Sequence, residues 1–304
     1  MNVQNPSASR GIAIQAVDLV KDYGTGDNTV HALRNVNVSF ERGKFTAIMG
    51  PSGSGKSTLM HTLAGLDSAT SGHILFGGAD LTRMNDKQLT LLRRHKIGFI
   101  FQSFNLLPMF TAEQNILMPL TLAGDKPDRA WFDLLVETLG LKQRLNHRPN
   151  ELSGGQQQRV AIARALITKP KLVFADEPTG NLDSVSSAEV LSFLKRSVNE
   201  LGQTIVMVTH DAVAASYADR AIVFADGQIV ADESNPTAET MNELLMSERE
   251  RAARTAVTST RADTLARLAG VKDVPNLPIT DAPLPPAGRT GTMRHARAVV
   301  QHAR

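Results

Sequence analysis

Five short apolar runs punctuate the chain, and longer stretches with helical spacing lie between them. Each run has four or five residues and almost no polar position, which is typical of strands buried on both faces. Strands that alternate with helices predict an α/β fold with a parallel sheet covered by helices. The predicted strands are Phe45–Met49, Ile97–Phe101, Leu172–Ala175, Ile205–Val208 and Ala221–Phe224.

Three stretches with helical spacing end next to a glycine, the residue that commonly follows a last helical turn. In the second stretch, Trp131, Leu134, Leu135 and Leu139 fall on one apolar stripe, and Ser184 stands where it can cap the third. The predicted helices are Thr58–Ala64, Ala130–Leu139 and Ser184–Leu201.

Alternating apolar and polar positions near the start of the chain predict antiparallel strands. Residues 12–16 and 36–40 alternate on either side of a turn-forming segment at Gly24. Towards the other end, Asp226-Gly227 separates two apolar runs and predicts a hairpin. The pattern therefore predicts a parallel-sheet core with a small antiparallel part, present once because no internal repeat is visible.

The charge distribution divides the 304-residue chain near residue 247. The formal net charge is +3, but residues 247–304 hold ten basic and five acidic residues, whereas residues 1–246 hold 23 and 25. A slightly acidic body argues against nucleic-acid binding. We predict a flexible N-terminus over 1–11, a folded domain over 12–246 and a basic, Pro-rich, largely disordered tail over 247–304. A basic helix resting on anionic lipid is the alternative for this tail.

The sequence also limits covalent chemistry and location. It contains no cysteine, which excludes disulfides, thiolate metal sites and cysteine nucleophiles. No apolar run reaches the ~18 residues that cross a bilayer, and the polar start has no secretory signal pattern. We therefore expect a chain that does not span a membrane by itself, with the cytosol as its default compartment.

The segment from Gly50 to Ser57 fits the pattern G-x-x-x-x-G-K-[ST] between a predicted strand and a predicted helix. Glycines let the backbone approach phosphate oxygens, so that successive N–H groups and the helix N-terminus point at the anion. In such a loop Lys56 lies between the outer phosphates and the Ser57 hydroxyl ligates Mg²⁺. The predicted nucleotide-binding residues here are Gly50, Pro51, Ser52, Gly53, Ser54, Gly55, Lys56, Ser57 and Thr58.

Two acidic residues, Asp176 and Glu177, end another predicted strand. A carboxylate at the end of a buried strand beside a phosphate loop is placed to hold Mg²⁺, directly or through water, and we assign this role to Asp176. Glu177 is then placed to polarise a water that attacks the γ-phosphate. The alternative is an exposed acidic pair that opens a turn before Pro178.

Leu152-Ser153-Gly154-Gly155-Gln156 opens a predicted helix over Gln156–Ile167, with Ser153 as N-cap and a second anion site at the helix start. With this segment the sequence resembles the ATP-binding subunits of ATP-binding cassette (ABC) transporters, over residues 12 to about 246. The family's other motifs follow in order, namely Gln102 after a strand, Asn181-Leu182-Asp183 after the acidic pair, and His210 after the strand Ile205–Thr209.

The resemblance implies a P-loop NTPase fold, the ABC cassette. In this fold a RecA-like parallel-sheet core carries an antiparallel β subdomain and a helical subdomain, here expected at about 103–165. It also implies ATP and Mg²⁺ as cofactors, and hydrolysis of ATP to ADP and phosphate as the reaction.

Roles for individual residues follow from the same resemblance. It implies that Glu177, His210, Lys56 and Gln102 are catalytic, and that Ser57, Gln102 and Asp176 hold the metal. Tyr23 would stack on adenine, and Asp183 would organise a dimer seam. Residues Ser153, Gly154, Gly155 and Gln156 would bind ATP held by the other subunit, so the resemblance implies a head-to-tail homodimer that closes on two ATP molecules.

Residues 104–108 and 175–184 look most like the MacB/LolD/FtsE-like branch, which serves macrolide export, lipoprotein release and cell division. Gln114 departs from this branch, which usually has Glu there. The resemblance implies a separate transmembrane permease of FtsX/MacB-like type, a peripheral position on the cytoplasmic side of the cell membrane, and no nucleic-acid partner. Phe104, Leu106, Leu107, Met109 and Phe110 either fill the core or line a groove for a permease helix, and we favour the groove for some of them.

Two functions remain open for this branch. The chain either energises transport, of the export or lipoprotein-release type, or serves as a regulatory ATPase of a membrane complex that remodels the cell wall or divides the cell without moving a solute. A soluble ABC ATPase of translation or DNA repair is a distant third, because such proteins usually carry two cassettes or a long coiled-coil insertion.

Overall fold

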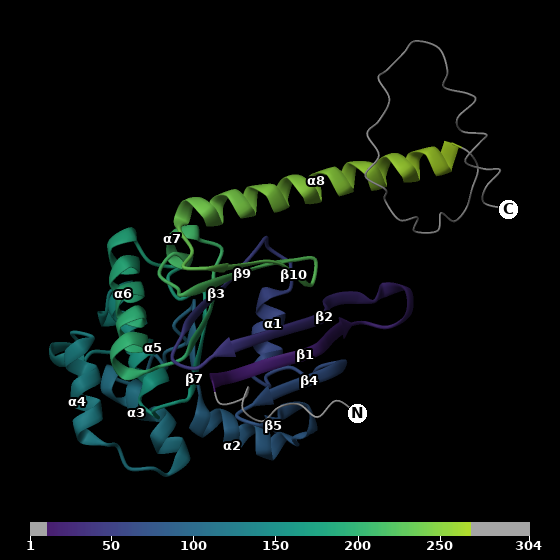
Figure 1. The fold of residues 1–304 in the computed structure, drawn as a ribbon. Helices are drawn as coiled ribbons and strands as arrows, with labels where there is room; N and C mark the ends of the chain where they lie inside the picture. The colour runs from purple at the N-terminus through teal and green to yellow at the C-terminus, as the bar shows by residue number, and fades with distance from the viewer. Residues whose placement is uncertain (1–10, 269–304) are drawn as a thin grey trace. The chain divides into compact units, whose positions relative to one another are not determined.

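The computed structural model describes residues 11–268 (Figure 1). The chain divides into two compact units, Met1–Met246 and Ser247–Arg304. The predicted flexible residues 1–10 and the predicted tail beyond 268 lie outside the described residues.

A six-stranded sheet forms the centre of the first unit. Its strand order is β10-β9-β3-β8-β7-β6, and every neighbouring pair is parallel except β9 and β10, which form the predicted hairpin at Asp226-Gly227. All five predicted parallel strands are confirmed. The strands are β3 (Phe45–Met49), β6 (Ile97–Phe101), β7 (Leu172–Asp176), β8 (Ile205–Val208), β9 (Arg220–Ala225) and β10 (Gln228–Ser234).

A second, four-stranded sheet has the order β2-β1-β4-β5 and is antiparallel throughout. The alternation near the start of the chain predicted its first two strands, which are much longer than the alternating segments. Its other two strands were not predicted. The strands are β1 (Ile12–Tyr23), β2 (Val30–Glu41), β4 (Ser71–Phe76) and β5 (Ala79–Asp80).

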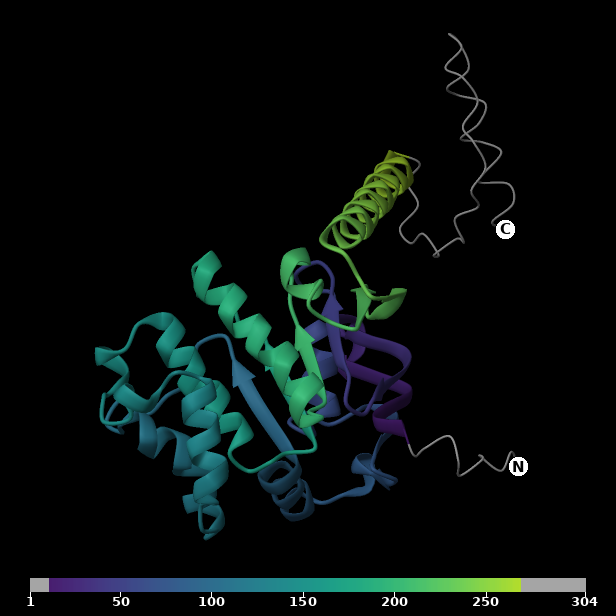
Figure 2. The ribbon, with the colours of Figure 1, turned by 60° about the vertical axis from the view of Figure 1, so that its left-hand side comes forward.

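The helices connect the strands of the central sheet. Helices α3 to α6 gather on one side of it, and the antiparallel sheet lies on the other (Figures 1 and 2). The α-helices of the first unit are α1 (Lys56–Leu63), α2 (Asp86–Lys96), α3 (Ala112–Ala123), α4 (Arg129–Thr138), α5 (Gly154–Leu166), α6 (Ser184–Leu201), α7 (Ala212–Ala215) and the start of α8 (Ala238–Leu268). Short 3-10 turns lie at Gly26–Asn28, Leu81–Arg83, Lys142–Arg144 and Pro149–Glu151.

Local details of three predicted helices differ from expectation. Helix α6 is capped by Asp183, whose carboxylate accepts from the N–H groups of Val185 and Ser186, so Ser184 is its first helical residue and not its cap. In α4, Leu134 is 46% exposed and does not belong to the buried stripe. Helix α5 begins at Gly154 rather than at Gln156, because the Ser153 cap already orders the two glycines as helix.

Two hydrophobic cores lie against the two faces of the central sheet. Alternate side chains of β3 divide between them, because successive side chains of a strand point to opposite faces. Phe45 and Met49 pack with helices α3 to α6, whereas Ile48 packs with α1 and the antiparallel sheet. The first residues of α8 join the former core through Met241 and Leu245.

Residues 247–268 of the second unit are helical and form the rest of α8. The prediction of a largely disordered tail and its alternative, a basic helix on anionic lipid, both stay predictions, because residues 269–304 lie outside the described residues. Among residues 11–268 no helix combines the length and the apolar character that crossing a bilayer takes.

Candidate functional site

Four neighbouring parallel strands carry the predicted catalytic residues past their carboxyl ends. In spatial order these strands are β3, β8, β7 and β6. In the sequence, the phosphate loop follows β3, His210 follows β8, Glu177 follows β7 and Gln102 follows β6. The carboxyl ends of parallel strands meet at one edge of the sheet, where α/β proteins bind ligands. The sheet topology thus gathers residues that lie up to 160 positions apart in the sequence.

Glycine is sterically required at two positions of the phosphate loop. A Cβ on Gly50, where φ is 146°, would lie 1.9 Å from the Phe224 carbonyl oxygen. A Cβ on Gly55, where φ is 101°, would lie 2.4 Å from the carbonyl oxygen of Ala32. Gly55 leads directly into α1, whose first turn has no side-chain cap from this residue. The loop therefore leaves backbone N–H groups at the helix start, where an anion is favoured.

Lys56 is 8% exposed, and its Nζ donates to the Pro51 carbonyl oxygen at 2.7 Å. Burial lowers the pKa of Lys56, while the charges of Glu177 and Asp176 oppose that shift. Nearby, Ser54 Oγ is buried with no hydrogen-bond partner among the described residues. A buried ammonium and an unsatisfied hydroxyl in one loop fit a phosphate ligand, which would satisfy both.

The acidic pair at the end of β7 occupies two different environments. Burial raises the pKa of Asp176, and the charge of Glu177 raises it further, against the charges of His61 and Lys56. Glu177 has a φ of 44°, and its N–H donates to the Val208 carbonyl oxygen at 2.9 Å. This strained backbone turns the Glu177 side chain towards His210, whose Nδ1 lies 2.9 Å from Glu177 Oε2. The sequence predicted roles for both residues but not their direct contact.

Gln102 follows β6 and is held by the loop after the acidic pair. Asn181 Nδ2 donates to the Gln102 carbonyl oxygen at 3.0 Å, and the two side-chain amides lie 3.5 Å apart. A Cβ on Gly180 would come within 2.7 Å of Gln102 Nε2, so a glycine permits this approach. Asn181 belongs to a motif that was noted in the sequence, but no role was predicted for it.

The Ser153–Gln156 segment packs against the start of α6 and the loop before it. Ser153 and Gln156 make a reciprocal capping box, with N···O distances of 3.0 and 3.3 Å. A Cβ on Gly155 would lie 2.8 Å from Ser186 Oγ, and Gly154 faces Leu182 and the Asn181 carbonyl oxygen. Asp183 accepts three hydrogen bonds at this place, from Val185 N, Ser186 N and Ser186 Oγ, and the last two lower its pKa most.

Two buried polar side chains hold the segment that follows Gln102, and sequence reasoning missed both. Arg164 of α5 is 8% exposed and donates to the carbonyl oxygens of Phe104 and Asn105 at 2.7 and 2.6 Å. These two residues have positive φ angles of 57° and 50°. Asn115 of α3 is fully buried and bonds to the backbone of Leu107, Phe110 and Thr111. The only sequence signal was a polar residue inside an otherwise apolar helical pattern.

The apolar residues of this segment divide between core and surface. Leu106 packs against the core, whereas Leu107 and Met109 are exposed. Gln114, where the MacB/LolD/FtsE-like branch usually has Glu, caps the start of α3. Its side-chain oxygen accepts a hydrogen bond from Thr111 N at 2.9 Å in the capping box of this helix.

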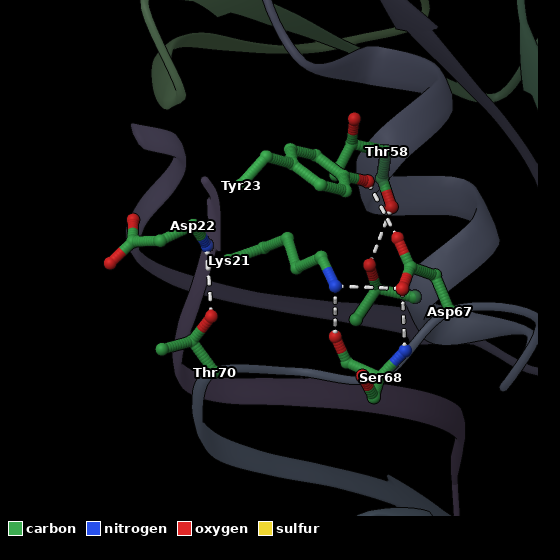
Figure 3. Close-up of polar contacts among 8 residues, drawn as sticks. Lys21, Asp22, Tyr23, Thr58, Asp67, Ser68 and Thr70 are labelled. Atoms are coloured by element: carbon green, nitrogen blue, oxygen red, sulfur yellow. Dashed lines mark hydrogen bonds and ion pairs between the residues drawn. The ribbon is translucent and has the colours of Figure 1, made fainter. Parts of the chain in front are cut away.

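Tyr23 ends β1, next to Thr58 in the first turn of α1 (Figure 3). It is 42% exposed, so its ring is accessible near the phosphate loop.

A Mg²⁺ site is compatible with the oxygen donors at the sheet edge, namely the Ser57 hydroxyl, the Gln102 amide and the Asp176 carboxylate. Within the described residues no cluster of three or more His, Asp or Glu side chains forms a metal cage. The oxygen donors that are present fit a hard cation such as Mg²⁺, which takes oxygen ligands.

Comparisons with known proteins agree with this geometry. Residues 33–180 match the model of the ABC transporter family. The chain is 48% identical over 221 residues to the lipoprotein-releasing system ATP-binding protein LolD of Geobacter metallireducens, covering 72% of this chain and 98% of that protein. The chain belongs to the ABC transporter family.

Two further matches place this ABC chain among its relatives. It is 47% identical to the macrolide export ATP-binding/permease protein MacB of Bdellovibrio bacteriovorus, over 70% of this chain but only 33% of that protein. A solved dimeric structure of an ATP-binding cassette in a post-hydrolysis state, bound to ADP and Pi, is 40% identical and has a TM-score of 0.67, with 73% of this chain and 98% of that chain covered. The predicted family and cassette fold are thus confirmed, and the chain is an ABC ATPase that binds ATP.

Proposed function

We propose that the chain is the energising subunit of an export or lipoprotein-release complex, which binds Mg²⁺-ATP as a head-to-tail homodimer and drives a separate permease of FtsX/MacB-like type. The observation that carries this proposal is the convergence of the phosphate loop, the acidic pair and His210 at one sheet edge, while the Ser153–Gln156 segment opens another helix start beside the loop that contacts Gln102. LolD supports it further, because this chain covers nearly the whole of that ATP-binding protein.

The residues at the sheet edge divide the chemistry between them. Lys56 and the loop N–H groups bind the phosphates, and Ser57, Gln102 and Asp176 hold Mg²⁺, which neutralises phosphate charge. Glu177 accepts a proton from the attacking water, because its carboxylate is held beside the γ-phosphate position by the turn after β7. His210, already paired with Glu177 through Nδ1, orients this carboxylate and donates to the γ-phosphate.

The second half of each ATP site comes from the other copy of the chain. Ser153 and the two glycines after it start a helix, and that helix end favours an anion. ATP then bridges two chains through charge-assisted contacts that ADP, which lacks the γ-phosphate, does not supply. The solved cassette bound to ADP and Pi is dimeric, which supports this arrangement for the present chain.

We propose that a permease helix docks in a groove beside α3. None of the residues predicted for such a groove lines it, namely Phe104, Leu106, Leu107, Met109 and Phe110. The groove has a volume of about 420 Å³, and Phe99, Phe101, Met118 and Leu122 give it apolar walls. Arg93 and Arg94 of α2 lie at the same groove. An amphipathic helix with an acidic end suits such a groove. This docking would put the chain on the cytoplasmic side of the membrane as a peripheral subunit.

Reconstitution with the candidate permease tests the proposal. The full chain and the permease are expected to co-purify and to show ATPase activity that differs from that of the chain alone. In vesicles, ATP-dependent movement of a solute or lipoprotein supports the transport function. A complex that hydrolyses ATP but moves neither would instead support the regulatory, cell-division type of function. Absence of both co-purification and any change in ATPase activity would refute a permease partner.

A further inference from the structure

A lysine and an aspartate outside every motif surround Tyr23 (Figure 3). Tyr23 Oη donates to Asp67 Oδ2 at 2.6 Å, and Lys21 Nζ donates to Asp67 Oδ1 and to the Ser68 carbonyl oxygen, both at 2.7 Å. The Lys21 ammonium also lies 4.7 Å from the centre of the Tyr23 ring. Although lysine is usually exposed, Lys21 is only 7% exposed. The three side chains therefore form one compact polar unit.

This unit connects the antiparallel sheet to the helix of the phosphate loop. Lys21 and Tyr23 are two positions apart in β1, so they share one face of the strand. Asp67 lies just after α1, and its N–H donates to the carbonyl oxygen of His61 in that helix at 3.3 Å. Thr58, in the first turn of α1, lies beside the Tyr23 hydroxyl. Tyr23 is thus tied to the same helix that begins at Lys56.

The electrostatics favour a charged, ordered unit. Burial by itself raises the pKa of Asp67, but the hydrogen bonds from Lys21 and Tyr23 outweigh it and leave that pKa below its ordinary value. Asp67 is therefore ionised at neutral pH and pairs with the Lys21 ammonium. Because Lys21 approaches one side of the Tyr23 ring and the residue is still 42% exposed, the ring keeps an open surface for stacking.

We propose that Lys21 and Asp67 are positioning residues that hold the Tyr23 ring at a fixed place relative to the phosphate loop, and thereby set the affinity for the base of the nucleotide. This inference rests on the proposed stacking of Tyr23 on adenine. A ring already ordered in the free protein loses less conformational entropy when the base binds. Affinity for the phosphates does not depend on this unit, since Lys56 and the loop N–H groups bind them.

Calorimetric titration of the full chain with two probes, Mg²⁺-ATP and Mg²⁺-tripolyphosphate, tests the proposal. Lys21→Met removes the ammonium but keeps most of the stem, and Tyr23→Phe keeps the ring but removes the bond to Asp67. Both are expected to raise the Kd for ATP by roughly 3- to 20-fold, less than the full contribution of a charge-assisted hydrogen bond, because Lys21 and Asp67 do not touch the base themselves. The Kd for tripolyphosphate, which has no base, is expected to stay unchanged.

Lys169→Met is the matched control. Lys169 Nζ also bonds an aspartate, Asp128, at 2.8 Å and lies 5.4 Å from an aromatic ring, that of Trp131, but this trio belongs to α4 and the turn after α5. This variant is expected to leave both Kd values unchanged.

Three outcomes would overturn the inference. If Lys21→Met loses equal affinity for ATP and for tripolyphosphate, the unit holds the phosphate loop instead of the ring. If neither Lys21→Met nor Tyr23→Phe loses affinity for ATP, the ring needs no support. If Tyr23→Ala loses affinity for ATP but not for tripolyphosphate, and Lys21→Met loses neither, the positioning role is refuted while the proposed stacking stands. Wild-type protein that binds ATP no better than tripolyphosphate would refute the proposed stacking itself.

Discussion

Glu177 has a left-handed backbone and a side chain that contacts His210, and the two features together define its chemistry. A strained residue persists only where the surrounding structure holds it in place, and here the Val208 carbonyl and the β7 ladder do so. Burial raises the pKa of its neighbour Asp176. This difference between adjacent carboxylates supports the proposed division into a base, Glu177, and a metal-holding group, Asp176.

The Glu177→Gln variant is expected to bind ATP and to hydrolyse it about 10²- to 10⁴-fold more slowly, because glutamine keeps the shape of the side chain but cannot accept the proton. Phosphate release and nucleotide binding, measured on the same preparation, separate the two effects. Lys56→Ala serves as the contrast, since it should lose binding and turnover together. Hydrolysis at the normal rate in Glu177→Gln would refute the assignment of the base.

At the scale of elements, single polar side chains join helices and loops that hydrophobic packing alone would leave free to shift. Arg164 joins α5 to the positive-φ turn at Phe104 and Asn105, at the opposite end of the helix from Ser153. Asp219 joins α6 to β3, since it accepts from Lys195 Nζ at 2.6 Å and from Phe45 N at 2.9 Å. Both residues set the spacing of elements that carry site residues.

Arg164→Met is expected to lower the free energy of unfolding by about 1–3 kcal/mol, because two part-buried hydrogen bonds from a buried guanidinium are lost. Denaturant unfolding measures this change. Arg159→Met on the same helix is the control. Arg159 forms a partly exposed ion pair with Glu189, which is worth about 1 kcal/mol or less. Equal losses in the two variants would contradict a special role for the Arg164 contacts.

Asp219→Asn is expected to destabilise the protein at neutral pH and progressively less in acid. Burial raises the pKa of Asp219, but the hydrogen bonds from Lys195 and Phe45 outweigh it and leave the pKa below its ordinary value of 3.8. The ionised carboxylate therefore contributes stability that is present above the unfolded pKa and is lost as the pH falls through the folded pKa. Thermal unfolding of both proteins from pH 7 down to about pH 2 should show a difference in stability that is constant near neutral pH and narrows below about pH 4. A difference that grows in acid would contradict this sign.

At the scale of the whole molecule, the proposed ATP site is complete only in a pair of chains. The phosphate loop follows β3 in the middle of the sheet, whereas Ser153 and the two glycines lie in the helical region that follows the edge strand β6. Each chain then contributes the phosphate loop of one site and the helix start of the other.

Mixing two inactive variants tests this arrangement. Lys56→Ala disables the phosphate loop, and Gly154→Asp places a negative charge where the γ-phosphate of the other chain would bind. The free chain has room for this side chain, because a Cβ on Gly154 meets its neighbours at 3.6 Å or more. The mixed pair retains one intact site, so ATPase activity should recover to roughly a quarter of the wild-type value when pairing is random. No recovery above the separate variants would contradict shared sites.

Much of this protein was predictable from short-range patterns. Buried parallel strands appear as continuous apolar runs, because both faces are covered, and all five were predicted. Strands β4 and β5 and helix α2 were not predicted. Helix α2 has no fully buried residue, and only Leu89 and Leu92 pack against the core from it, so its apolar stripe is too short to reveal it. The phosphate loop carries its geometry in its own glycines, so its sequence alone indicated a phosphate ligand.

Contacts between distant residues depended on the tertiary structure. Glu177 pairs with His210, 33 positions later in the sequence, and Arg164 bonds to the turn after Gln102, 60 positions earlier. In the Lys21–Asp67–Tyr23 unit, Asp67 lies 46 positions after Lys21 and 44 after Tyr23. The amino-acid sequence by itself determined which groups are present and which local backbone they adopt, because those depend on near neighbours. Only the packing of strands and helices decided which groups meet, because strand order and side-chain burial are properties of the whole folded chain.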